Sequence, residues 1–359
     1  MRDFKWYCVN NLKKENHTAG NKAPSDCFRI ASDMGAEEVV FLHTKPQSNI
    51  YLTRIMGLFD GIQNWLGLYR RVKRDSWVVL QHPNENILVA NHFIDICKKR
   101  KNIHFIALIH DMDSIRSSFL YGKQLSKRNI LADETVLKKC DRYICHNEKM
   151  KQYMVENGFA EDKIVCLGIF DYLHDCELPE MRKKEKAVVV AGNLMPNKCE
   201  YLYKIQKQEN LPFTLHLFGP NYEEAVKNAN VEYHGSCKPD ELPGKLVGSF
   251  GLVWDGTELD SCKGKAGEYI RYNNPHKCSL FLASNMPVII WKEAALASFV
   301  EENGVGVTVD SLMEIGSAIE SLTEEQYAKM VINTVKVSKH LRSGYYLTQA
   351  LNKSFDAVQ

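Results

Sequence analysis

The chain alternates between short apolar runs and longer segments with helical spacing. In the first half, runs rich in β-branched and aromatic residues predict strands at Phe4–Val9, Val39–Leu42, Trp77–Leu80, Ile103–Ile109, Tyr143–Cys145 and Ile164–Leu167. Helices are predicted between them, for example at Ile50–Val72 and Asn86–Lys99. The strands are continuously apolar, which is typical of a parallel sheet that helices cover on both faces.

This alternation breaks once, at Asp171–Lys186, and then restarts. The break is polar, contains Pro179 and lacks an apolar rhythm, so we interpret it as a linker. Beyond it, strands are predicted at Ala187–Ala191, Phe213–Phe218, Val231–Tyr233, Phe250–Trp254, Pro287–Trp291 and Val305–Val309. Helices are predicted at Pro239–Val247, His276–Ser284, Ala294–Glu302, Glu324–Lys339 and Tyr346–Phe355.

Two successive α/β units of this kind predict two Rossmann-like domains that face a cleft, with ligands at the carboxyl ends of the strands. We place the first domain at residues 1–170, the linker at 171–186 and the second domain at 187–340. A terminal helix at 341–359 is expected to pack back on the first domain. The length of 359 residues agrees with two domains.

Composition and cysteine usage favour a cytoplasmic protein. The chain is 45% hydrophobic and 25% charged, which is average for soluble globular proteins. Its 11 cysteines are odd in number and include no C-x-x-C, which argues against a disulfide framework and a zinc ribbon. No run reaches the roughly 18 apolar residues of a membrane span, and the first residues do not resemble a signal peptide.

Charge is balanced in total, 46 basic against 44 acidic residues, but unevenly distributed. Residues 1–151 carry 25 basic and 16 acidic side chains, whereas residues 152–180 carry one and seven. Basic clusters at residues 70–74 and 98–101 end helical segments, where cations complement the helix dipole. The alternative is a peripheral contact with anionic lipid at the inner face of the cell membrane. Nothing resembles a nucleic-acid-binding motif, so no nucleic acid partner is expected.

In the first domain, the sequence IHDMDSIR at residues 109–116 follows a buried strand. A base that deprotonates a hydroxyl needs a carboxylate or an imidazole within hydrogen-bond reach, so His110, Asp111 and Asp113 are the catalytic candidates. We prefer Asp111. The alternative is that Asp113 or Ser114 only caps the next helix.

The first βα loop, Asn10–Asp26, is too long for a dinucleotide turn, and G-x-G-x-x-G is absent from the chain, which argues against an NAD enzyme. Within this loop His17, Thr18 and Gly20 are candidates for contacts to the acceptor or a phosphate. A plain solvent-exposed loop is the alternative.

In the second domain, Gly192 and Asn193 follow a strand directly, where a glycine lets a phosphate approach the backbone, and Lys198 adds charge. Pro275 suits a first helical turn, so Lys277 and the nearby N–H groups form an anion site; a lysine that serves only solubility is the alternative. His234, after another strand, and the neighbours of Lys277, Asn274 and Ser279, complete the candidate donor site. Neither H-E-x-x-H nor G-x-S-x-G occurs, and no metal is expected.

The order of these second-domain segments is similar to a known pattern. Their order resembles that of the nucleotide-binding half of GT-B glycosyltransferases. The segments are GN after a strand, then LFGP, YHG, PDEL, FGLVW and PHKCSLFLASNMPVI. Together with IHD in the first domain, they resemble the bacterial glucosyl- and galactofuranosyltransferase group that includes the third glucosyltransferase of streptococcal adhesin glycosylation. The resemblance implies transfer of glucose or galactofuranose from a UDP-sugar to a saccharide acceptor in cell-surface polysaccharide or glycoprotein glycan synthesis, without metal or other cofactor.

By the same resemblance, Lys277 matches the family's diphosphate lysine, Gly192 and Asn193 its donor loop, and Thr18 a first-domain contact to donor or acceptor. Many GT-B enzymes carry two glutamates eight positions apart, and this chain has Tyr272 and Leu280 there. A retaining mechanism that depends on those carboxylates loses support, so we expect a single inverting displacement.

Other readings remain open at this point. One is a GT-B-shaped, non-catalytic partner subunit that binds the acceptor or a sister enzyme, and another is a sugar-nucleotide epimerase of the same shape. The sequence does not distinguish the sugar, the linkage, a lipid-linked from a free acceptor, or a homo-oligomer from a monomer.

Overall fold

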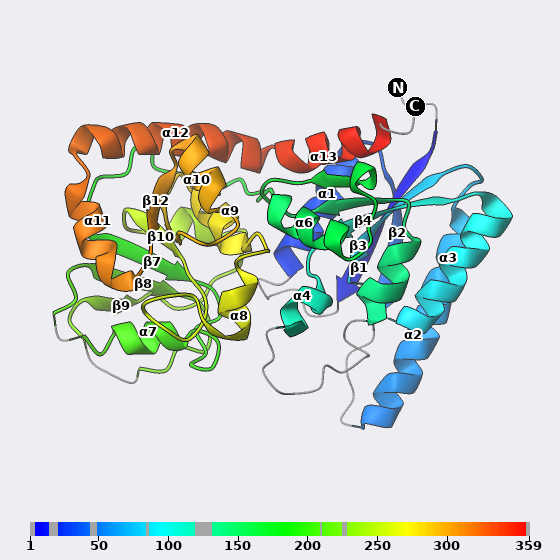
Figure 1. Cartoon of the computed structure of the whole chain (residues 1–359), viewed down its shortest axis with the longest axis horizontal. Helices are drawn as coiled ribbons and strands as arrows, with labels where there is room; N and C mark the ends of the chain where they lie inside the picture. Colours follow the sequence, from blue (N-terminus) through cyan, green and yellow to red (C-terminus); the bar gives the residue numbers. More distant parts are fainter. Residues whose placement is uncertain are drawn as a thin grey trace. The chain divides into compact units, whose positions relative to one another are not determined.

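The computed structural model describes residues 4–13, 21–43, 49–83, 86–118, 131–208, 210–224 and 228–356. The chain divides into two compact units, one of Met1–Leu167 with Leu347–Gln359 and one of Gly168–Tyr346. The described residues of each unit form one six-stranded sheet in which every pair of neighbouring strands is parallel (Figure 1). The predicted α/β fold with two parallel sheets is confirmed.

In the first unit the strands are β1 (Trp6–Lys13), β2 (Glu37–His43), β3 (Trp77–His82), β4 (His104–Ile109), β5 (Arg142–Cys145) and β6 (Ile164–Cys166). The helices are α1 (Lys22–Asp33), α2 (Ile50–Arg71), α3 (Ile87–Lys101), α4 (Asp113–Ser118) and α6 (Glu148–Glu156), with a π-helical turn η2 (Ala132–Val136) and 3-10 turns at Leu137–Lys139 and Glu161–Lys163. The strand order is β2-β1-β3-β4-β5-β6.

Aromatic and aliphatic side chains fill the first unit on both faces of its sheet. Every residue of β3 is buried, which the apolar run Trp77–Leu80 predicts for its first four residues. From α2, Trp65 packs against Phe41 of β2 and Phe105 of β4, with ring centroids 5.4 and 6.5 Å apart. This contact holds the second half of α2 against the sheet, beside α3 (Figure 1).

Helix α13 (Tyr345–Asp356) ends in the first unit. Its Phe355 lies with its ring centroid 5.3 Å from that of Phe4, 5.1 Å from Trp6 and 6.1 Å from Trp77. These contacts bury the last helical turn against β1 and β3 and explain why the chain returns to the first unit.

In the second unit the strands are β7 (Ala187–Ala191), β8 (Thr214–Phe218), β9 (Val231–Tyr233), β10 (Phe250–Val253), β11 (Val288–Trp291) and β12 (Gly306–Val309). The helices are α7 (Glu200–Ile205), α8 (Gly264–Tyr269), α9 (His276–Ala283), α10 (Ala297–Asn303), α11 (Ile315–Ser321) and α12 (Glu324–Arg342), with 3-10 turns at Leu242–Lys245 and Leu312–Glu314.

The second sheet has the order β12-β11-β10-β7-β8-β9. Counted from β7, this is the strand order 3-2-1-4-5-6 of dinucleotide-binding Rossmann domains. The direction of progression reverses between β7 and β10, and ligands of such sheets bind outside the carboxyl ends of the strands at that reversal. Residues that follow β7 and β10 are therefore the first to consider for a site.

Two local predictions are wrong. The predicted helix Pro239–Val247 is only a 3-10 turn at Leu242–Lys245, because Pro243 lacks an N–H donor and Gly244 disfavours a helix. The predicted loop Asn10–Asp26 is shorter, since β1 continues to Lys13 and α1 begins at Lys22.

The segment that we predict as a linker, residues 171–186, has no helix or strand and belongs to the second unit. Its Arg182 is buried and donates hydrogen bonds to the carbonyl oxygens of Leu246, Gly248 and Ser284, at 3.2, 3.0 and 3.0 Å. The guanidinium thus fastens this segment to the second unit.

Candidate active site

Glycines line the carboxyl end of the second sheet beside the strand reversal. Gly192 follows β7 with a φ of +139°, and Gly219 follows β8. A Cβ atom on Gly219 would lie 1.7 Å from the carbonyl oxygen of Gly192, so only glycine fits there. The Gly192 N–H donates to the Phe218 carbonyl at 3.0 Å. A Cβ atom on Gly192, by contrast, would meet no atom within 4 Å, so the backbone at Gly192 is within reach of a ligand.

Asn193, which follows Gly192, shapes the turn after β7. Its side-chain oxygen accepts hydrogen bonds from the Met195 N–H and the Asn221 amide, each at 3.1 Å. The side chain thereby holds the loop after β7 to the loop after β8.

Lys277, in the first turn of α9, lies on the other side of the strand reversal. Its Nζ donates to the carboxylate of Asp255 at 2.8 Å and to the carbonyl of Trp254 at 2.9 Å, both directly after β10. The ammonium therefore stands at the end of β10 and at the N-terminus of a helix, where the helix dipole also favours an anion. This combination suits a diphosphate.

Cys199, in the segment between β7 and α7, is buried near Lys277 and Asp255. Burial raises the pKa of its thiol to about 11, while the nearby Lys277 lowers it and Asp255 raises it by smaller amounts. The Tyr201 N–H of α7 donates to the Gly256 carbonyl at 3.5 Å, so the start of α7 lies beside the loop that follows β10.

The other donor candidates lie in different surroundings. The Asn274 amide is buried and donates to the Gly168 carbonyl at 2.9 Å, and Ser279 is buried within α9. Lys198 has an exposed side chain in the loop after β7. Asn274 therefore has a role in holding the fold, whereas Lys198 is accessible to a ligand.

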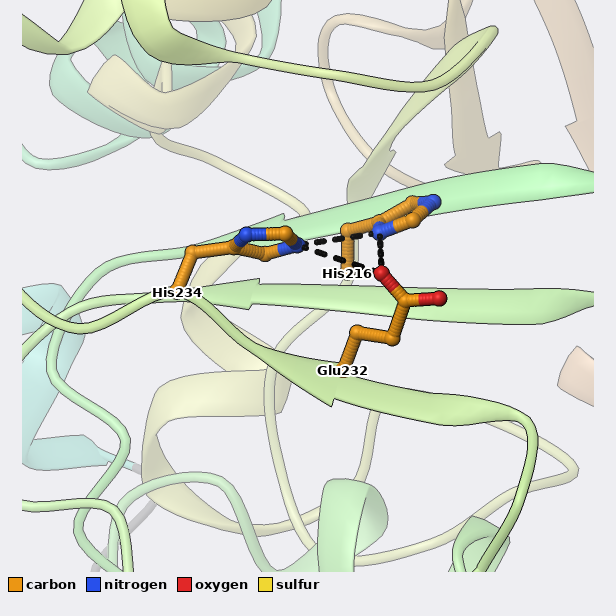
Figure 2. A group of neighbouring side chains, drawn as sticks. All are labelled: His216, Glu232 and His234. Atoms are coloured by element: carbon orange, nitrogen blue, oxygen red, sulfur yellow. Dashed lines mark hydrogen bonds and ion pairs between the residues drawn. The ribbon is translucent and has the colours of Figure 1, made fainter.

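His234 follows β9 and belongs to a separate group of side chains (Figure 2). Its Nε2 lies 3.1 Å from Nδ1 of His216 on β8 and 3.8 Å from the carboxylate of Glu232 on β9. Burial is the main cause that lowers the pKa of His216. The sequence analysis did not identify His216 and Glu232 as site residues, although a polar residue inside each of two short strands could have indicated a site.

In the first unit, His110 follows β4 and is held by Gln81 of β3. The His110 Nε2 lies 2.7 Å from the Gln81 side-chain oxygen, and the Gln81 amide nitrogen donates to the Val9 carbonyl at 3.0 Å. Because that nitrogen donates, the Gln81 oxygen accepts, and Nε2 of His110 must carry a proton. In the neutral ring Nδ1 is then the basic nitrogen. The sequence analysis did not identify Gln81 as a site residue, although a polar residue directly after the apolar run Trp77–Leu80 could have indicated one.

The two aspartates near His110 differ in their contacts. Asp111 lies 3.2 Å from the guanidinium of Arg116, and both side chains are partly exposed. Asp113 is the first residue of α4. A carboxylate from another element caps the first turn of α4. Asp133 of the π-helical turn accepts a hydrogen bond from the Ser114 N–H at 2.7 Å.

Asp133 joins this helix to the end of β3. Its second oxygen lies 2.7 Å from Nε2 of His82, and both side chains are buried. The His82 carbonyl in turn accepts from the His110 N–H at 2.8 Å. This network fixes the backbone beside His110. The remaining candidates, His17, Thr18 and Gly20, lie outside the described residues.

Comparisons with known proteins identify the family of this chain. Residues 5–169 match the N-terminal domain, and residues 188–354 the C-terminal domain, of the family described as glucosyltransferase 3-like. The β-1,6-galactofuranosyltransferase WbbI of Escherichia coli K12 is 33% identical, over 98% of this chain and 99% of that protein. Glucosyltransferase 3 of Streptococcus gordonii is 30% identical, over 94% of this chain and 93% of that protein.

Solved structures share the fold at low sequence identity. WaaG, a glycosyltransferase involved in lipopolysaccharide biosynthesis, matches with a TM-score of 0.59 and 10% identity, over 97% of this chain and 99% of that chain. The pneumococcal O-GlcNAc transferase GtfA in complex with UDP and GlcNAc matches with a TM-score of 0.54 and 13% identity, over 84% of this chain and 60% of that chain. Since the family matches cover both halves of the chain, it belongs to the glucosyltransferase 3-like family of glycosyltransferases, with the GT-B fold.

Proposed function

We propose that this protein transfers a hexosyl group, glucose or galactofuranose, from a UDP-sugar to a saccharide acceptor during synthesis of a cell-surface polysaccharide or glycoprotein glycan. The observation that carries the proposal is Lys277, which stands at the N-terminus of α9 beside the strand reversal of a Rossmann-ordered sheet. The activities named for WbbI and glucosyltransferase 3, and the UDP bound by GtfA, support this choice of donor and sugar.

In this proposal the second unit binds the nucleotide. Gly192 lets the diphosphate approach the backbone, and Lys277 with the N–H groups of α9 stabilises the negative charge that develops on the leaving UDP. Preorganised charges of this kind are worth most in a site from which water is excluded. The chain's own ammonium group performs the charge neutralisation, and the proposed mechanism uses no metal or other cofactor.

The first unit supplies the base. Nδ1 of His110 takes the proton of the acceptor hydroxyl while the oxygen attacks the anomeric carbon; the bond from that carbon to the diphosphate breaks, and its electron pair leaves with UDP. A single displacement inverts the anomeric carbon. We favour His110 over Asp111 because Gln81 fixes the tautomer of the imidazole, whereas Asp111 pairs with Arg116 near the surface.

Binding and turnover test the proposal in two steps. The purified chain should show a higher melting temperature with UDP than with GDP, and a panel of UDP-sugars should identify the donor. Incubation of that donor with simple glycosides should then give a glycosylated product with inverted configuration. Binding of UDP without transfer or donor hydrolysis would instead favour a non-catalytic partner subunit.

We also propose that helix α2 rests on an anionic membrane surface. Its first half carries an exposed apolar stripe, and residues 51–60 include no buried side chain. The large apolar residues that are exposed on α2 are Tyr51, Leu52, Ile55, Leu58, Phe59 and Ile62. At 100° per residue they fall within one third of the helix circumference, and Arg70 and Arg71 end the same helix. Amphipathic helices with basic flanks bind interfaces in this way.

Among the described residues, no helix has both the length and the apolar character to cross a membrane. Attachment through α2 would therefore be peripheral and should appear in vesicle flotation. The chain should float with phosphatidylglycerol vesicles and not with phosphatidylcholine vesicles, and the double variant Ile55→Glu/Phe59→Glu should not float. Gln63→Glu, an exposed change outside the stripe, is the matched control. Loss of a dimer rather than of flotation in the double variant would assign the stripe to self-association.

A further inference from the structure

Strand pairing in the second unit places two imidazoles and one carboxylate on the same face of the sheet. His216 of β8 lies directly opposite Glu232 of β9 in the parallel register. His234 is two residues beyond Glu232, and side chains two apart along an extended chain point to the same side. As Figure 2 shows, a ring nitrogen of each histidine and one oxygen of Glu232 turn toward a common point.

The distances between the three donor atoms match those of a metal site. Nδ1 of His216 lies 3.1 Å from Nε2 of His234 and 3.4 Å from the Glu232 oxygen, and that oxygen lies 3.8 Å from Nε2 of His234. Ligands bound tetrahedrally at about 2.0–2.1 Å from a zinc ion are about 3.3 Å apart. The three atoms therefore already stand at the spacing that Zn²⁺ requires.

We propose that His216, Glu232 and His234 form a binding site for a divalent transition metal, with Zn²⁺ as the best fit. Two imidazoles and a carboxylate are ligands that zinc accepts, and they leave a fourth position for water. Phe218 stacks on the ring of His234, with centroids 4.6 Å apart and planes 9° from parallel. This contact fixes the orientation of His234 before a metal binds.

A hydrogen bond between the two histidines explains only part of the arrangement. One shared proton forms a hydrogen bond between Nδ1 of His216 and Nε2 of His234. It does not explain why the Glu232 oxygen lies close to both rings. The Glu232 side chain is 56% exposed, yet its oxygen lies within 4 Å of both rings. Two neutral imidazoles and a carboxylate together offer lone pairs to a cation.

The metal would tie β9 to β8. β9 has three residues, lies at the edge of its sheet, and is partly exposed along its whole length. A cation bound by ligands from both strands stabilises only the folded state, and the gain in stability grows with its concentration. This role does not depend on the proposed transfer reaction, because none of the three ligand residues takes part in the steps of that reaction.

Titration of the full chain after removal of metals by a chelator tests the site. One equivalent of Zn²⁺ should bind and raise the melting temperature. Co²⁺ in its place should give the visible absorption bands of a tetrahedral complex, without the near-ultraviolet charge-transfer band of thiolate ligands. Absence of that band matters because the chain has 11 free cysteines.

Variants locate the bound ion. Glu232→Gln and His216→Ala should each weaken Zn²⁺ binding at least about tenfold, whereas His92→Gln, an exposed histidine on α3, should leave it unchanged. Melting temperatures without metal show whether each variant is folded, and Glu232→Gln is an exposed, isosteric change. Unchanged Zn²⁺ affinity in folded Glu232→Gln, a thiolate band with Co²⁺, or no binding to the wild-type chain would overturn the proposal.

Discussion

Lys277 and Asp255 form an ion pair between the start of α9 and the end of β10, with Nζ 2.8 Å from the carboxylate oxygen. The Trp254 carbonyl holds the same ammonium at 2.9 Å. Two acceptors from one strand end thus orient the lysine, while Asp255 offsets its charge. A diphosphate that approaches would be attracted by Lys277 and repelled by Asp255, so the two residues should affect donor binding in opposite directions.

Lys277→Ala should therefore lower kcat/KM by about 10²–10³-fold, because the charge that develops on UDP loses its main partner. Asp255→Asn should change kcat/KM much less, since the Trp254 carbonyl still orients the lysine. Initial rates with a saturating acceptor measure both effects. Lys292→Ala, which removes an exposed lysine from a pair with Asp310, is the control. Full activity of folded Lys277→Ala would refute the donor-site assignment.

The hydrogen bond from His110 to Gln81 leads to a prediction about the base. His110→Ala should reduce kcat by about 10²–10⁴-fold, the usual contribution of general base catalysis. Gln81→Leu should give an intermediate loss and an altered pH profile of kcat, because the imidazole loses the acceptor that selects its tautomer. Asp111→Asn should retain nearly full kcat. A large loss in Asp111→Asn with an active His110→Ala would return the role of base to Asp111.

Burial of His146 predicts a loss of stability in acid. This side chain, at the end of β5, donates from Nε2 to the Ile109 carbonyl at 3.0 Å, and burial lowers its pKa to about 4. In the unfolded chain the pKa is about 6.5, so between these values the unfolded state binds more protons than the folded state. The free energy of unfolding should fall by about 3 kcal/mol as the pH drops from 7 to 4.

Urea unfolding at pH 7, 5.5 and 4 measures this change. His146→Asn, which retains a side-chain donor and does not titrate, should lose less stability over the same range than the wild-type chain. His92→Gln, at an exposed position, should keep the full pH dependence. Equal pH dependence in His146→Asn and the wild-type chain would show that other groups cause the acid sensitivity.

Substitution of Arg182 tests how much the segment before β7 contributes to the stability of the second unit. Burial lowers the pKa of this guanidinium to about 10, and it nevertheless donates to three backbone carbonyls. Arg182→Met should destabilise the second unit by about 3 kcal/mol, because those buried carbonyls lose a charged donor. The neighbouring Lys183 has an exposed side chain, and Lys183→Met should stay within about 0.5 kcal/mol of the wild-type chain. Thermal unfolding distinguishes the two.

The predicted strands illustrate what could be read locally. Ala187–Ala191 and Val231–Tyr233 have the predicted bounds. In Ala187–Ala191, three successive valines favour a strand, and every residue of that strand is buried. The helix predicted at Pro239–Val247 failed for a local reason as well, since its apolar spacing hid the effects of Pro243 and Gly244. Hydrophobic pattern alone is a weaker predictor than pattern combined with backbone chemistry.

The positions of two candidate site residues could be predicted because the carboxyl ends of parallel strands meet at one edge, while their roles stay a prediction. Lys277 was singled out from the start of its helix, and His110 from its position after a buried strand. Their partners were not, because Asp255 is 22 residues from Lys277 and Gln81 is 29 residues from His110 in the chain. Hydrogen-bond partners at such separations depend on which strands are neighbours.

By itself, the sequence determined the α/β class, the two sheets and the candidate residues after their strands, since burial of apolar surface is encoded in local patterns of side chains. Only the tertiary structure decided that β10 lies beside β7, and that His216 lies opposite Glu232. Strand order and register arise from the packing of the whole unit, and polar groups distant in sequence acquire their chemistry only when that packing brings them together.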